Sequence, residues 1–141
     1  MIRELRKADI DKVAEIWLDT NIKVHDFIPA QYWESNFESV KELLPQATVY
    51  VYEDDQGIQG FIGLNDEYIE GIFVSDGMQS QGIGRLLLNY AKTKRNKLRL
   101  NVYRKNTRAI AFYQREGFEI LCSGIDEATG EKDHVMEWRR K

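Results

Sequence analysis

The sequence predicts an α/β fold, a mixed sheet of six to seven strands packed with four helices. Its 141 residues are enough to bury one core, and 43% of them are hydrophobic, which is typical of a globular protein. Apolar residues recur at helical spacing in some segments and at strand spacing in others. No repeat, low-complexity stretch or linker divides the chain, so we expect a single domain over residues 1–141.

The N-terminal segments predict one strand and two helices. Residues 2–5 alternate weakly, as a short strand does, and apolar residues at helical spacing predict a helix over 10–23. A second helix is predicted over 29–44, because Pro29 suits the first turn of a helix and Pro45 ends the apolar stripe.

From residue 48 onward the period changes to that of strands. Residues 48–52 are rich in β-branched and aromatic side chains and lead into a turn, so they predict a hairpin with a strand over 58–64. A further strand is predicted over 68–74.

Next, helices alternate with strands. A helix starting near Gly82 precedes a strand over 98–103. A helix over 107–116 follows and ends at Gly117, which is suited to a left-handed C-cap.

The last two strands, near 118–125 and 134–138, flank a polar turn that contains Gly130. Cys122 lies on the first of these strands, and we expect it to be a buried small residue and not a nucleophile. Because it is the only cysteine, the chain cannot form an internal disulfide, which fits a reducing compartment.

Composition disfavours secretion, membrane insertion and metal binding. The N-terminus is too charged for a secretory leader, and no apolar run approaches the roughly 20 residues that span a bilayer. The two histidines, His25 and His134, do not form a metal-ligand pattern with the single cysteine. We therefore expect a cytoplasmic protein that has no metal and no membrane association.

Charge is divided unevenly along the chain. Residues 77–115 contain ten basic residues and no acidic one, although the net charge of the whole chain is −3. Residues 1–76 hold 16 acidic and six basic residues. This asymmetry indicates that one region meets a polyanion and another meets a cation. The alternative is a solvated basic helix face.

A glycine-containing loop, Gln79-Ser80-Gln81-Gly82-Ile83-Gly84, lies between a predicted strand and a predicted helix. Free backbone N–H groups and the positive end of the helix dipole meet there, and glycines let an anion approach the backbone. We therefore expect a bound diphosphate, with an ordinary helix start as the alternative. The loop matches neither the P-loop pattern nor the dinucleotide-binding fingerprint.

Two motifs resemble signatures of the GNAT superfamily of N-acetyltransferases. Gln79-x-x-Gly82-x-Gly84 is similar to the acetyl-CoA loop of that family. Asn106-x-x-Ala109-x-x-Phe112-Tyr113-x-x-x-Gly117-Phe118 is similar to its second signature. The predicted order of elements over all 141 residues is also that of the family. The segment from His25 to Trp33 resembles small bacterial YjaB-like members.

The resemblance implies acetyl-CoA as the co-substrate and no metal. It places coenzyme contacts on the backbone of the strand before the loop, on the loop, and on the second signature. These residues are Ile72, Phe73, Val74, Gln79, Ser80, Gln81, Gly82, Ile83, Gly84, Arg85, Asn106, Ala109 and Tyr113. Asn106 can also cap the helix that follows it. The phosphates of CoA then become the polyanion that the acid-free segment meets.

Catalytic roles also follow from the resemblance. Tyr113 matches the general acid of the family, since a phenol with a pKa of about 10 is protonated at pH 7 and can donate to a departing thiolate. The alternative is a tyrosine packed on the core face of its helix. The general base stays open between Glu70, on the strand before the loop, and His25, whose ordinary pKa near 6.5 suits a base.

We therefore expect an N-acetyltransferase that moves acetyl from acetyl-CoA to a primary amine by direct attack in a ternary complex. The acceptor is a protein lysine, an N-terminus or a small amine, bound by His25, Phe27 and Tyr32. The alternative is a non-catalytic acyl-CoA-binding module. Nucleic-acid binding through the basic segment is a third hypothesis, which the few aromatic residues of that segment disfavour. We expect a monomer or a homodimer.

Overall fold

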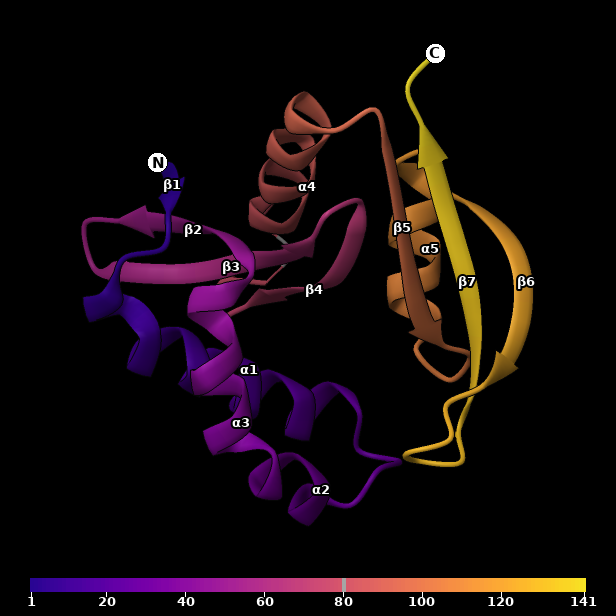
Figure 1. Cartoon of the computed structure of the whole chain (residues 1–141), viewed down its shortest axis with the longest axis horizontal. Coiled ribbons are helices and arrows are strands. Elements are labelled where there is room, and N and C mark those ends of the chain that lie inside the picture. The colour runs from indigo at the N-terminus through magenta and orange to yellow at the C-terminus, as the bar shows by residue number, and fades with distance from the viewer. Residues whose placement is uncertain (80) are drawn as a thin grey trace.

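The computed structural model describes residues 1–79 and 81–141, which form a seven-stranded sheet with the strand order β1-β2-β3-β4-β5-β7-β6 (Figure 1). Every neighbouring pair of strands is antiparallel except β4 and β5, which are parallel. The predicted mixed sheet is confirmed. The strands are β1 (Ile2–Glu4), β2 (Thr48–Asp54), β3 (Gly57–Asn65), β4 (Tyr68–Val74), β5 (Lys97–Tyr103), β6 (Glu119–Ile125) and β7 (Lys132–Arg139).

Helices cover both faces of the sheet. Figure 1 shows α1 and α3 on one side of strands β2 to β4, α4 on the other side, and α5 behind β5 and β7. No helix in the described part of the chain is long and apolar enough to cross a membrane. The helices are α1 (Ile10–Val24), α2 (Ala30–Ser35), α3 (Phe37–Leu43), α4 (Ile83–Lys94) and α5 (Thr107–Arg115), with short 3-10 turns at Lys7–Asp9 and Leu44–Gln46.

The described residues thus form five α-helices where the sequence predicted four, because the helix predicted over 29–44 is divided at Asn36. The Asn36 side-chain amide donates to the backbone oxygen of Tyr32 (2.7 Å). The Asn36 backbone N–H bonds instead to the oxygen of Trp33 (3.1 Å). An asparagine side chain that takes a backbone carbonyl competes with the helical ladder, so the chain turns there.

Two hydrophobic cores lie on opposite faces of the sheet, as the alternation of side chains along strands requires. The first packs α1 against β2 and β3 and comprises Val13, Ala14, Ile16, Leu44, Val49, Val51, Ile58 and Phe61. The second packs α4 and α5 against the sheet and includes Leu87, Leu88, Ala91, Ile62, Ile69, Leu98, Leu100, Tyr113, Phe118 and Met136. The first core fixes α1 and the second fixes α4 and α5, so the elements around the opening between β4 and β5 are held from both faces.

Strands β4 and β5 separate soon after they meet. Their only bridging pair among the described residues joins Tyr68 to Arg99, whereas β5 and β7 remain paired from Lys97 to Tyr103. Figure 1 shows β4 and β5 diverging beyond this point. The sheet therefore opens along the rest of β4, on the side where the family resemblance places the coenzyme.

A β-bulge interrupts β4 at Glu70. Gly63 of β3 lies opposite Gly71, but Leu64 lies opposite Ile69, so Glu70 is the extra residue. Ile69 and Ile72 both pack in the α4 and α5 core. The bulge therefore leaves Glu70 on the opposite face, as bulges beside active sites re-aim a side chain.

The expectation that Cys122 is buried is wrong. Cys122 is exposed, as is every residue of β6. The reason is topological, because β7 inserts between β5 and β6 and makes β6 an edge strand. In contrast, the predicted left-handed glycine after α5 is confirmed, with φ of 95° at Gly117. The predicted turn between the last two strands contains Gly130, whose φ is 75°.

Candidate functional site

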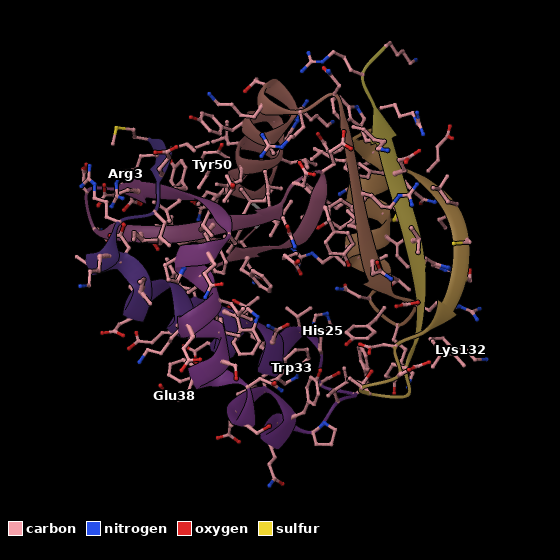
Figure 2. The ribbon with its side chains drawn as sticks, viewed as in Figure 1. Arg3, His25, Trp33, Glu38, Tyr50 and Lys132 are labelled. Atoms are coloured by element: carbon pink, nitrogen blue, oxygen red, sulfur yellow. The ribbon has the colours of Figure 1, made fainter. Side chains whose placement is uncertain are left out.

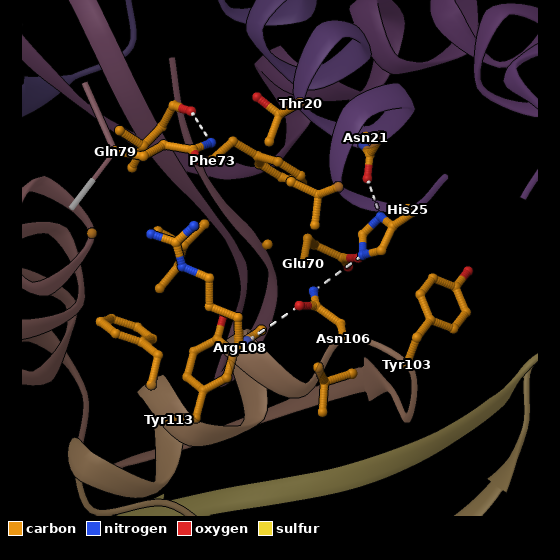
Figure 3. A pocket seen from close by; sticks show the side chains of 18 of the residues that line it. Thr20, Asn21, His25, Glu70, Phe73, Gln79, Tyr103, Asn106, Arg108 and Tyr113 are labelled. Carbon is orange, nitrogen blue, oxygen red and sulfur yellow. Dashed lines mark hydrogen bonds between the residues drawn. The ribbon is translucent and has the colours of Figure 1, made fainter. Parts of the chain in front are cut away.

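A cleft of about 1190 Å³ lies where β4 and β5 diverge. Its walls come from α1, β4, the start of α4, the end of β5 and α5, with the loop between β6 and β7 at one end. Figure 3 shows side chains from α1, β4, β5 and α5 pointing toward a common space.

Backbone groups of β4 face this opening. The N–H of Ser75 donates to the oxygen of Gln59 on the β3 side (2.8 Å). Because backbone groups alternate in direction along a strand, Phe73 also turns its N–H and C=O toward β3, while Ile72 and Val74 turn theirs toward the opening. Beyond the single bridge with β5, no strand of the described residues pairs with these groups.

The loop between β4 and α4 carries several predicted coenzyme contacts. Gln79 lines the cleft, and its side-chain amide donates to the outward-facing oxygen of Val74 (3.2 Å). Gln81 does not line the cleft through its side chain, which donates to the oxygen of Gly77 (3.3 Å). Ser80, also a predicted contact, lies outside the described residues.

The N-terminus of α4 opens into the cleft. Gly82 is the N-cap, with φ of 83°, a left-handed conformation that explains the glycine there. The first backbone N–H groups of the helix, from Ile83 to Arg85, have no intrahelical acceptor. Gly82, Ile83, Gly84 and Arg85 all line the cleft. This arrangement suits an anion, since the helix dipole adds to the free donors.

Basic side chains reinforce this end of the cleft. Arg85, Arg108 and Arg115 line it, and Figure 3 shows Arg108 extending from α5 into the space. Arg85 lies 3.6 Å from the carboxylate of Glu116. The sequence motifs did not assign roles to Arg108 and Arg115. The one sequence feature that could have pointed to them is that both lie in the acid-free segment, residues 77–115.

Tyr113 projects from α5 toward the centre of the cleft (Figure 3). Its ring packs between Phe112 and Phe118, at centroid distances of 5.2 and 5.4 Å. Burial raises the pKa of the Tyr113 hydroxyl, so the phenol stays protonated at neutral pH. No hydrogen bond between described residues uses this hydroxyl, which leaves its proton available to a ligand.

Glu70 also lines the cleft. Its side chain remains exposed to solvent, yet partial desolvation raises the pKa of its carboxyl. Within residues 1–79 and 81–141, no hydrogen bond or ion pair involves this carboxylate. Glu70 is therefore a basic group in contact with water, aimed into the cleft by the bulge.

His25 follows α1 and is held at both ring nitrogens (Figure 3). Nδ1 lies 2.9 Å from Oδ1 of Asn21, whose amide nitrogen donates to the oxygen of Trp17. Nε2 lies 3.3 Å from the amide nitrogen of Asn106. Nδ1 must therefore donate and Nε2 must accept, which defines a neutral imidazole. Burial lowers the pKa of His25 to about 4, in keeping with that neutral form.

Asn106 links α5 to this histidine. Its side-chain oxygen accepts the backbone N–H of Ala109 (3.2 Å), so the predicted cap of α5 is confirmed. Its amide nitrogen donates to His25, which ties the end of α1 to the start of α5 across the cleft. Asn106 and Ala109 both line the cleft.

Aromatic side chains surround His25. Trp33 stacks on its ring at 5.6 Å, while Phe27 and Tyr103 contact it edge to face at 5.7 and 5.1 Å. Figure 2 shows Trp33 beside His25. Of the predicted acceptor-binding residues, His25 and Tyr32 line the cleft. Phe27 packs against the ring of His25 and is not part of the lining.

Carboxylates from the C-terminal hairpin complete this end of the cleft. Asp126 and Asp133 both line it. The Tyr103 hydroxyl donates to Asp126 (2.6 Å). No sequence pattern marked these two acids, because their position depends on β7 pairing with β5.

The described part of the chain contains no group of three or more His, Cys, Asp or Glu residues placed to hold a metal ion. The cleft instead combines basic groups and free N–H donors at one end with carboxylates and aromatic rings at the other. Tyr113 and Glu70 lie in the same cleft. Such an arrangement can hold a phosphorylated donor and a cationic acceptor together.

A sequence profile of the acetyltransferase (GNAT) domain matches residues 45–120. The chain is 32% identical over 140 residues to the peptidyl-lysine N-acetyltransferase YiaC of Escherichia coli (strain K12). This alignment covers 98% of this chain and 96% of YiaC. The solution structure of apo YjaB from Escherichia coli matches with a TM-score of 0.87 at 24% identity, over 100% of this chain and 98% of that chain. The structure of the PaiA N-acetyltransferase from Thermoplasma acidophilum in complex with coenzyme A matches with a TM-score of 0.81 at 21% identity. This match covers 99% of this chain and 98% of that chain. The chain therefore belongs to the GNAT family of acetyltransferases.

Proposed function

We propose that this acetyltransferase moves the acetyl group of acetyl-CoA to the side-chain amine of a lysine residue, by direct attack in a ternary complex. The observation that carries the proposal is the opening between β4 and β5. It brings the outward-facing backbone of β4, the N-terminus of α4, Tyr113 and Glu70 to one cleft.

The groups at the α4 end fit the coenzyme. Free N–H groups of the first turn and the side chains of Arg85 and Arg108 suit the negative charges of a diphosphate. The outward-facing N–H and C=O of Ile72 and Val74 suit the amide groups of the pantetheine arm and the thioester oxygen. Bound acetyl-CoA supplies the acyl thioester, and these residues hold it in place.

A base is needed because a lysine amine is mostly protonated at pH 7. Its ordinary pKa of about 10.4 means that neutralisation costs about 4.6 kcal/mol. Glu70 is the better candidate, since its carboxylate is free among the described residues and its raised pKa makes it a stronger proton acceptor. In His25 the lone pair on Nε2 already accepts from Asn106, so we assign His25 to holding the acceptor wall.

Tyr113 serves as the general acid in this proposal. Its hydroxyl is protonated at neutral pH and lies in the cleft without a protein partner among the described residues. A departing thiolate in the same apolar surroundings also has a raised pKa, because desolvation disfavours its charge. Burial therefore raises the pKa values of both the Tyr113 phenol and the departing thiol, and the phenol can still donate its proton to the thiolate.

The acceptor is proposed from two considerations. The relative YiaC is named a peptidyl-lysine N-acetyltransferase, and it aligns with nearly the whole chain. In addition, the acceptor end of the cleft carries the carboxylates of Glu70, Asp126 and Asp133, which attract a cation. A lysine side chain satisfies both.

Thiol release in the presence of a lysine peptide tests this function. The peptide is blocked at its N-terminus, and a matched peptide carries norleucine in place of lysine. We expect free thiol in an amount equal to the Nε-acetylated lysine found by mass spectrometry, and none above background with norleucine. Acetyl-CoA binding without thiol release, for peptides and small amines alike, would instead indicate a non-catalytic acyl-CoA-binding module.

A further inference from the structure

We propose that Asp133 binds the positive charge of the acceptor amine and thereby selects protonated primary amines. This inference rests on the proposed function and assigns to one residue the recognition that precedes acetyl transfer. It concerns a residue of β7, a strand that contributes to neither of the two family signatures.

Asp133 is a buried carboxylate in the wall of the cleft. It is 8% exposed, and on β7 it lies opposite Tyr103 of β5. Its Oδ2 accepts one hydrogen bond, from the side-chain amide of Asn101 (3.2 Å). Its Oδ1 has no hydrogen bond, and no ion pair reaches the carboxylate from any described residue. Among the described residues, one oxygen of Asp133 thus has no hydrogen-bond donor, and no cation neutralises its charge.

A chain of hydrogen bonds orients this carboxylate. The Tyr68 hydroxyl donates to Oδ1 of Asn101 (2.8 Å), which places the amide nitrogen of Asn101 toward Asp133. Desolvation and the nearby charge of Glu70 raise the pKa of Tyr68, so the phenol remains a donor. The chain runs from β4 through β5 to β7 and links Asp133 to the strand that carries Glu70.

The other three carboxylates of the cleft are committed elsewhere. Glu116 pairs with Arg85, which also lines the cleft. Asp126 accepts from the Tyr103 hydroxyl through Oδ2 and from the backbone of Ala128 through Oδ1, which stabilises the turn after β6. Glu70 is the proposed base. Asp133 is the carboxylate whose burial is offset neither by a cation nor by a full set of hydrogen bonds.

A carboxylate that no cation neutralises attracts a counter-charge that enters the cleft. An ammonium group is small, carries three donors, and suits a carboxylate in the wall of the cleft. We infer that Asp133 holds the protonated acceptor as it enters, and that the proton is lost only when the nitrogen reaches Glu70. Asp133 therefore acts in binding and specificity and takes no part in bond making.

Isosteric replacement of Asp133 tests this role. We expect Asp133→Asn to raise the KM for a lysine peptide by about tenfold or more, with kcat within about threefold and the KM for acetyl-CoA unchanged. Glu131→Gln is the matched control, because it removes a negative charge from the same hairpin at a residue that pairs with Lys105 and does not line the cleft. Its kinetic constants should equal those of the wild type.

A binding measurement gives a second readout. With CoA present, the wild type should bind the lysine peptide at least about tenfold more tightly than the norleucine peptide, and Asp133→Asn should bind both equally. If the variant does not fold, the wild-type comparison still applies. In that case Tyr68→Phe, which frees the Asn101 amide, should raise the KM for the lysine peptide about threefold or more.

Two results would overturn the inference: an unchanged KM for Asp133→Asn, or equal binding of both peptides by the wild type. Either can occur while the wild type still acetylates lysine, so the proposed function would stand. Absence of thiol release by the wild type with every amine would refute the proposed function itself. The two failures are therefore distinguishable.

Discussion

Burial moves the pKa values of Glu70 and His25 in opposite directions, because it disfavours the charged form of each side chain. The carboxyl of Glu70 becomes a stronger base in its ionised form. The imidazole of His25, with its pKa lowered to about 4, stays neutral and hydrogen-bonded on both nitrogens. We therefore propose different tasks for these two candidate bases.

A pH–rate profile separates these tasks. A carboxylate base works only when ionised, so we expect kcat/KM for a lysine peptide to fall as the pH drops through the pKa of Glu70, above the usual range of a carboxyl. Glu70→Gln should lower kcat by about a hundredfold and abolish this acidic limb. His25→Ala should keep the limb. An acidic limb that disappears in His25→Ala but persists in Glu70→Gln would identify the histidine as the base.

His25 should also make stability depend on pH. Its pKa is about 4 in the folded protein and about 6.5 when unfolded, so the unfolded chain binds the proton first. The stability that comes from keeping His25 neutral is present in full above pH 6.5 and is lost as the pH falls toward 4. Urea unfolding at pH 7 and pH 4.5 should show a loss of roughly 2 to 3 kcal/mol in the wild type that is absent in His25→Gln. Equal losses in both proteins would contradict this assignment.

Single residues were predictable where a motif fixes their surroundings. The cap formed by Asn106 and the left-handed glycine at 117 followed from position relative to one helix. Asp133 could not be found in this way, because its burial and its bond to Asn101 depend on the pairing of β5 with β7. The role of Tyr113 stays a prediction that the geometry allows.

At the scale of elements, the N-cap and the first turn of α4 hold two glycines, each required for a different reason. Gly82 has a φ of 83°, and a Cβ there would meet nothing within 4 Å. Gly84 has no such φ, and its Cβ would come no closer than 3.8 Å to a neighbour. The left-handed backbone requires glycine at Gly82. At Gly84 we predict that glycine is needed so that a ligand can approach the backbone.

Alanine substitutions should separate these reasons. Gly82→Ala should lower the free energy of unfolding by about 1 kcal/mol, because alanine disfavours the left-handed region. Gly84→Ala should keep or slightly raise stability, since alanine favours helix, yet weaken acetyl-CoA binding by about tenfold. Thermal melts and calorimetry measure the two effects. Native affinity in Gly84→Ala would show that the ligand does not approach the backbone at that residue.

Most elements were predictable from periodicity, and the exceptions have local causes. The helix predicted over 29–44 breaks at Asn36 because a side-chain amide takes a backbone carbonyl. The bulge at Glu70 arises from register with β3, which a single strand does not reveal. Both exceptions border the cleft or the helices that wall it.

At the scale of the whole molecule, basic and acidic residues from different parts of the sequence lie at opposite ends of one cleft. Arg85, Arg108 and Arg115 line it together with the start of α4, whereas Asp126 and Asp133 come from the C-terminal hairpin. Other basic residues of the 77–115 segment serve the fold instead. Lys97 and Arg99 pair with Glu67 and Glu137.

This division was only partly predictable. The acid-free segment and the glycine loop indicated a phosphate site from sequence alone. The acidic end was expected in the first 76 residues, yet Asp126 and Asp133 reach it from the other end of the chain. Local patterns do not state which strand pairs with which, so the insertion of β7 beside β5 had to be seen in the structure.

The central claim is that this cleft holds acetyl-CoA so that Tyr113 can protonate the departing thiolate. Comparison of Tyr113→Phe with the wild type tests it most directly, by calorimetric affinity for acetyl-CoA and by thiol release with a lysine peptide. We predict an affinity within about threefold of the wild type and turnover lower by about a hundredfold or more. Wild-type turnover in the variant would contradict the claim.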